Sequence, residues 1–166
     1  SDITDIMENV KNQLSTIGIK FISYDKKLII KELAKHGMIY KDNDELKSKP
    51  GIHKFDEYIT INIVSQDNNV LKTKEYGIAA GIAMGNHVFI GEGYNELRFK
   101  GILAHELTHV WQNQNKITRT SRINREGLAE LVQAHIFKMD TTYVGKQMYK
   151  SQKYQKYKVY REGYKK

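Results

Sequence analysis

The chain has 166 residues, a formal net charge of +8 and no cysteine. This length is typical of one domain with a substantial core. The lack of cysteine excludes disulfides, thiolate zinc sites, iron–sulfur clusters and a cysteine nucleophile, and it leaves the compartment open. No apolar run approaches the roughly 20 residues of a membrane helix, and we expect no signal peptide in this chain.

The positive charge is concentrated at the C-terminal end. Residues 138–166 hold nine Lys and Arg against two acidic residues, a net charge of +7, which leaves +1 for the first 137 residues. We therefore expect a body, residues 1–140, and a basic helix rich in Tyr and Lys, residues 141–166, packed on the same domain. Contact of this helix with nucleic acid or an anionic membrane is the alternative. The oligomeric state stays open.

The first part of the body mixes helical and strand patterns. Helical periodicity predicts a helix over 5–17 and a second one that begins after Asp25 and ends near Gly37. Apolar residues after Gly18 predict a short strand over 19–24. The polar residues 42–51 predict a loop.

The central part is typical of strands. Residues 58–64 alternate apolar and polar and predict a strand, and a turn at 67–69 leads into residues 70–73. Residues 77–90 predict a hairpin around Gly85-Asn86. The glycine-rich stretch 77–93 is either an ordinary hairpin or an edge to which an extended peptide substrate adds.

The helical period returns after residue 94, with helices predicted over 95–113 and 121–139. In the first of these, an apolar stripe lies on the side away from two histidines: Phe99, Leu103, Leu107 and Val110. A small mixed sheet followed by helices predicts an α+β fold.

The strongest chemical signal is His105-Glu106-Leu-Thr-His109. Histidines four apart on a helix face one point, so both imidazoles can bind one metal ion. This is the HExxH pattern of zinc metallopeptidases, in which Glu106 acts on water as general base.

A catalytic zinc site needs a third protein ligand, and the next helix offers two carboxylates four residues apart. We assign Glu126 as the ligand, with Glu130 as the alternative. In the preferred arrangement Glu130 accepts the spare N–H of a ligand histidine. His135 projects to the opposite side of the helix from Glu126, and we expect it to pack in the core.

His105 to His109 followed by Glu126 on a second helix resembles the glutamate-zincins, which include thermolysin and the leukotriene-hydrolase-like aminopeptidases. In particular, Ile102 to Glu106, Trp111 and Glu126-Gly127 resemble the peptidase domain of the LIM-containing, ubiquitin-activated regulators of plant organ size. The likeness covers about residues 97–137. This chain lacks the cysteines of LIM modules and an identifiable ubiquitin-binding helix, and the interval of 16 residues between His109 and Glu126 is shorter than is usual in thermolysin.

The resemblance implies a zincin-like α+β fold and a zinc peptidase, most simply an endopeptidase, that hydrolyses a protein or peptide substrate. Zn²⁺ is the implied cofactor. Tyr94, Arg98 and Tyr143 are candidates by position alone for stabilising the oxyanion. The competing interpretation is a non-catalytic zincin-like binding module whose basic tail binds nucleic acid or membrane. The intact Glu106 argues against it, because a module without activity needs no base.

Overall fold

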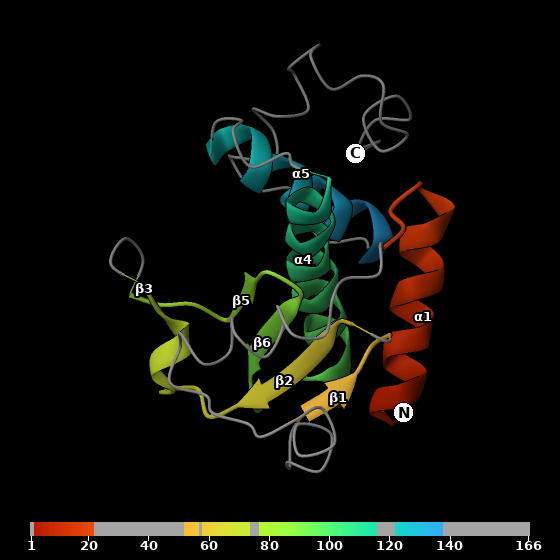
Figure 1. Ribbon diagram of the computed structural model, residues 1–166. Coiled ribbons are helices and arrows are strands. Elements are labelled where there is room, and N and C mark those ends of the chain that lie inside the picture. Colours follow the sequence, from red (N-terminus) through yellow and green to blue (C-terminus); the bar gives the residue numbers. More distant parts are fainter. Residues whose placement is uncertain (1, 22–51, 57, 74–76, 116–121, 138–166) are drawn as a thin grey trace. The chain divides into compact units, whose positions relative to one another are not determined.

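A computed structural model of the chain describes residues 2–21, 52–56, 58–73, 77–115 and 122–137 (Figure 1). The chain divides into a helical unit, residues 1–21 and 96–166, and a sheet unit, residues 22–95. Within these described ranges, three helices and a small mixed sheet give the predicted α+β class. The helix expected after Asp25, the loop 42–51 and the basic helix expected over 141–166 lie outside the described residues.

Helix α1 (Ile3–Thr16) begins the helical unit. Asp2 caps it, because its side chain accepts a hydrogen bond from the Asp5 backbone N–H at 2.9 Å. One face of the helix is buried, in agreement with the helical spacing of its apolar residues: Ile6, Met7, Val10 and Leu14. Helix α1 packs against α4 (Glu96–Gln114).

The strand predicted over residues 19–24 is wrong for its described part, because residues 19–21 have no regular structure. Gly18 has a φ of 89°, a left-handed conformation that ends α1. Its N–H donates to the Ser15 carbonyl at 3.1 Å, and the Ile19 N–H reaches back to the Leu14 carbonyl at 3.0 Å. Ile19 is therefore buried as part of the helix end, where an apolar residue commonly packs.

Helices α4 and α5 (Arg122–Phe137) pack against each other and carry the two segments predicted as helical. Their apolar stripes are buried as expected. The buried side chains are Phe99, Leu103, Leu107 and Val110 on α4, and Leu128, Leu131 and Val132 on α5. The polar side chains of α4 that point toward α5 therefore lie outside this apolar stripe.

The sheet unit contains a four-stranded sheet in the order β1-β2-β6-β5. The strands are β1 (Ile52–Lys54), β2 (Thr60–Val64), β5 (Gly81–Met84) and β6 (His87–Gly91). The β2–β6 pair is parallel and the other two pairs are antiparallel, so the sheet is mixed as predicted. A 3₁₀ turn, η1 (Asn69–Leu71), leads to a two-stranded sheet of β3 (Lys72–Thr73) and β4 (Gly77–Ile78).

The predicted strands differ from the structure at two points. Strand β2 begins at Thr60 rather than residue 58, because the Asp56 side chain accepts the backbone N–H groups of Tyr58 and Ile59 at 2.9 and 3.0 Å and holds them in a turn. Strand β1 was not predicted. The β5–β6 hairpin is confirmed, and Gly85 in its turn has a φ of 58°.

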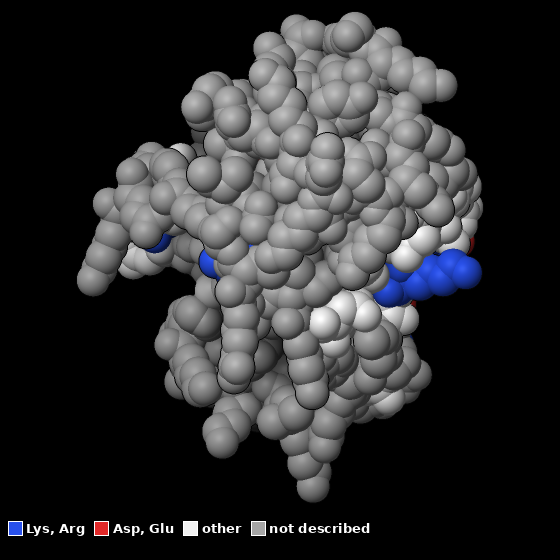
Figure 2. All heavy atoms as spheres, turned by 90° about the horizontal axis from the view of Figure 1, so that it is seen from above, with Lys and Arg blue, Asp and Glu red and all other residues white. Residues whose placement is uncertain are grey.

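None of the described helices combines the length and the apolarity that crossing a lipid bilayer requires. In the view from above, a few Lys and Arg side chains of the described residues are visible at the surface (Figure 2). The basic segment 141–166 lies outside the described residues.

Candidate metal centre

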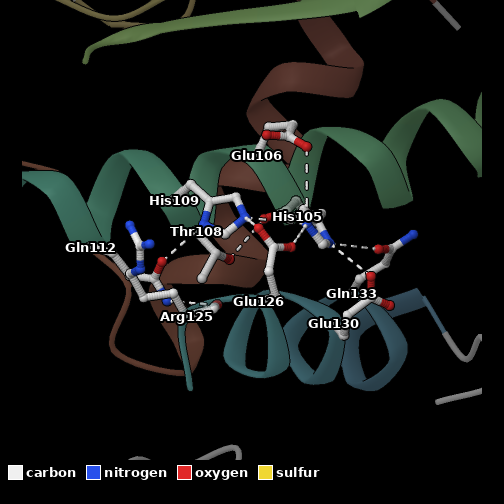
Figure 3. Close-up of polar contacts among 10 residues, drawn as sticks. His105, Glu106, Thr108, His109, Gln112, Arg125, Glu126, Glu130 and Gln133 are labelled. Atoms are coloured by element: carbon white, nitrogen blue, oxygen red, sulfur yellow. Dashed lines mark hydrogen bonds and ion pairs between the residues drawn. The ribbon is translucent and has the colours of Figure 1, made fainter. Parts of the chain in front are cut away.

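The two histidines of the HExxH pattern project from α4 toward α5 (Figure 3). They are one helical turn apart, and their rings meet edge to face, with centroids 5.0 Å apart and an interplanar angle of 73°. The Nε2 atoms of His105 and His109 are 3.3 Å apart. Both rings therefore direct the same nitrogen to a common point.

Glu126 of α5 completes this point. Its Oε2 lies 3.1 Å from Nε2 of His105, and its Oε1 lies 3.1 Å from Nε2 of His109. The three side chains form a set of possible metal ligands within 4.8 Å of one another, the only such set among the described residues. The Glu126 side chain is 39% exposed, so the set can be approached from solvent.

Glu106 lies beside this triad but does not belong to it. Its side chain is buried and leaves α4 on the side away from α5 (Figure 3). One carboxylate oxygen is 4.0 Å from Nε2 of His105. At this distance the carboxylate can reach a water molecule held near the triad, which is the position a general base requires.

The other nitrogen of each histidine faces a glutamine that the sequence analysis did not single out. His105 Nδ1 lies 3.1 Å from Oε1 of Gln133, and His109 Nδ1 lies 2.9 Å from Oε1 of Gln112. Glu130 is on the expected side of His105, but its Oε1 is 3.6 Å from Nδ1, so the hydrogen bond goes to Gln133. The available signal was spacing, since Gln112 follows His109 by three residues and Gln133 follows Glu130 by three.

The charges of the cluster shift three pKa values. Burial by itself lowers the pKa of His105, but the bond to Glu126 and the charges of Glu106, Glu126 and Glu130 outweigh it and raise this pKa to about 9. Burial opposes ionisation of Glu126 as well, yet hydrogen bonds from the two histidines hold its pKa well below the usual value. Burial raises the pKa of Glu106 against the opposing effect of the histidines.

The donor set fits a zinc ion. Two ligand atoms that are each 2.0–2.1 Å from a tetrahedral ion lie about 3.3–3.4 Å apart. The Nε2 atoms are 3.3 Å apart and each lies 3.1 Å from a Glu126 oxygen. Two imidazoles and one carboxylate, with partial exposure to solvent, are also the ligands of catalytic zinc sites that keep a position for water.

The remaining predicted residues lie elsewhere. His135 is half-buried on α5 and does not belong to the triad. Arg98 is exposed near the start of α4, two helical turns before His105. Tyr94 belongs to the sheet unit, and Tyr143 lies outside the described residues. The structure therefore gives no reason to select one of these three as an oxyanion donor.

Comparison with known proteins finds a family model that matches the segment carrying part of this site. Residues 62–117, about one third of the chain, match the family described as the eCIS core domain. A search of curated proteins and a search of solved structures gave no match. The matched segment includes His105, Glu106 and His109 and ends before Glu126.

Proposed function

We propose that this protein is a zinc-dependent peptidase with a zincin-like fold, which hydrolyses bonds in a protein or peptide substrate. One observation carries the proposal: two imidazole nitrogens and a carboxylate meet at 3.1–3.3 Å, with a second, buried carboxylate 4.0 Å from one of the nitrogens. The resemblance of His105 to His109 and Glu126 to the glutamate-zincins supports it. So does the match of the HExxH segment to the eCIS core domain.

Each residue has a distinct role in this proposal. His105, His109 and Glu126 would hold the metal, and zinc bound there would supply Lewis-acid chemistry and activate water for attack on a peptide carbonyl. Glu106 accepts the proton of the attacking water and returns it to the leaving amine, so the base is regenerated in each cycle. Its raised pKa makes Glu106 a stronger proton acceptor than an ordinary carboxylate.

The test combines metal analysis with peptide cleavage. The wild-type protein should contain one zinc per chain and should cut a peptide library, with new termini detected by mass spectrometry. Glu106→Gln should keep the zinc and lose roughly 10²–10⁴-fold of the cleavage rate, the usual contribution of a general base. Glu96→Gln is a matched control, because Glu96 is an exposed glutamate at the start of the same helix.

Two results would count against a peptidase. Cleavage by Glu106→Gln at the wild-type rate would remove the proposed base. Stoichiometric zinc in a wild-type protein that cuts no peptide would favour the non-catalytic binding module. The peptide library has to contain many different sequences. The three proposed ligands indicate hydrolysis of a peptide bond, but they do not indicate which substrate side chains are preferred.

A further inference from the structure

Gln112 is a buried amide whose two ends are both used. Its side chain lies between α4 and α5, and the residue is 1% exposed. The amide nitrogen donates to the Arg125 backbone carbonyl at 3.0 Å, and the amide oxygen lies 2.9 Å from His109 Nδ1. Burial of an amide is unfavourable unless both ends are hydrogen-bonded, as they are here.

The Arg125 carbonyl fixes which way the amide points. A carbonyl oxygen only accepts, so the NH₂ end of Gln112 must face it and the oxygen must face His109. Because that oxygen also only accepts, His109 Nδ1 must carry a proton. The other nitrogen, Nε2, faces Glu126, to which it donates a hydrogen bond in the metal-free protein, and a metal ion bound there would take the place of that proton.

The bond also ties His109 to the helix that carries the third ligand. Arg125 immediately precedes Glu126 in the chain, so Gln112 links the ring of one proposed ligand to the backbone beside another. His105 differs, because its Nδ1 has Gln133 at 3.1 Å and Glu130 at 3.6 Å. In the described part of the chain, Gln112 is the acceptor that His109 Nδ1 contacts.

We propose that Gln112 is a positioning residue of the metal centre: it holds His109 as the Nδ1–H tautomer and fixes its ring against α5, so that Nε2 is presented as a metal ligand. The inference rests on the proposed function only in taking His109 as a metal ligand. It requires no peptide hydrolysis. Residues that orient a ligand histidine in this way typically contribute 10- to 100-fold to metal affinity.

The experiment measures zinc affinity by competition with a chromophoric chelator, and the tautomer of His109 by ¹⁵N NMR of the zinc-loaded protein at about pH 8. Gln112→Met keeps the length of the side chain and removes both polar contacts. It should weaken zinc binding about 10- to 100-fold and give His109 a mixture of tautomers. The matched control is Gln114→Met, since Gln114 is another buried glutamine on α4. It should change neither readout.

Gln112→Glu separates positioning from folding. Its carboxylate still accepts from Nδ1–H but cannot donate to the Arg125 carbonyl, so the wild-type tautomer should persist and zinc affinity should exceed that of Gln112→Met. Zinc affinity of Gln112→Met equal to that of Gln114→Met would overturn the proposal. Loss of the Nδ1–H tautomer in folded Gln112→Glu would overturn the proposal as well. This second result decides the question even if Gln112→Met does not fold. A wild-type protein that binds zinc with this tautomer and cuts no peptide would overturn the peptidase alone.

Discussion

Glu126 and Glu130 lie one helical turn apart on α5, yet they face opposite nitrogens of the same ring. Glu126 is 3.1 Å from Nε2 of His105, whereas Glu130 is 3.6 Å from its Nδ1. In the proposed centre the two nitrogens have different roles, because one would bind the metal and the other would fix the tautomer. The distances therefore favour Glu126 as a ligand and leave Glu130 as a neighbouring negative charge.

Alanine substitutions should separate these roles. Glu126→Ala removes one of three ligands, and we expect zinc affinity to fall roughly 100-fold or more, whereas Glu130→Ala should cost at most about tenfold, the lower range for groups behind a ligand. Chelator competition on the two purified variants is the measurement. A larger loss in Glu130→Ala than in Glu126→Ala would reverse the assignment.

Much of this site could be predicted from the sequence, and the missed part has a physical cause. His105 and His109 follow from one helical spacing, and Glu126 from the need for a third ligand. The spacing of Gln112 and Gln133 is too weak a signal to select them, because a glutamine three residues from an ionisable residue is common on solvated helix surfaces. Their contacts depend on how closely α5 approaches α4, and a single sequence does not contain this distance.

At the scale of elements, α1 depends on a glycine at its C-terminal end. Gly18 has a φ of 89°, and no atom beyond its chain neighbours lies within 4 Å of where a Cβ would be. A substitution there therefore costs backbone strain without a steric clash. Gly18→Ala should destabilise the protein by about 1 kcal/mol. Gly18→Asn should cost less, because asparagine tolerates the left-handed region better than alanine.

The measurement is denaturant unfolding of the wild-type protein, Gly18→Ala and Gly18→Asn. Equal stability of the alanine and asparagine variants would show that the φ at this position does not limit stability. The same helix end explains why the strand prediction after Gly18 was wrong: Ile19 is buried because its N–H closes the end of α1 on the Leu14 carbonyl.

The longer elements were predicted correctly because their periodicity is sustained. Helices α1, α4 and α5 each repeat apolar residues over three or more turns, and the β5–β6 hairpin has a glycine turn between apolar strands. Strand β1 has three residues, Ile52–Lys54, too few for any pattern. It exists through antiparallel pairing with β2, a contact between segments that a local pattern does not encode.

At the scale of the whole molecule, the proposed ligands join two helices of one unit. His105 and His109 come from α4 and Glu126 from α5, and both helices belong to the helical unit. A bound metal would therefore act as a cross-link between them and stabilise the native state by mass action. With free zinc at about 1,000 times its Kd, the gain should be about 4 kcal/mol.

Stability should depend on pH more steeply without zinc than with zinc. In the metal-free protein, the pKa of His105 is raised from 6.5 to about 9. The ion pair therefore contributes fully below pH 6.5, and its contribution is lost as the pH rises through about 9. We expect a loss on the order of 3 kcal/mol. Glu106, whose pKa burial raises, acts in the same direction, while Glu126 is ionised throughout this window.

Zinc should flatten this slope. Protons and the metal compete for Nε2 of His105, so zinc binding strengthens as the pH rises and offsets the loss of the ion pair over the same window. Denaturant unfolding at several pH values, with excess zinc or with a chelator, tests both slopes. Glu126→Ala is the control, because it removes the strongest cause of the raised pKa of His105 and should flatten the metal-free slope. Parallel slopes with and without zinc would show that protons and metal do not share this histidine.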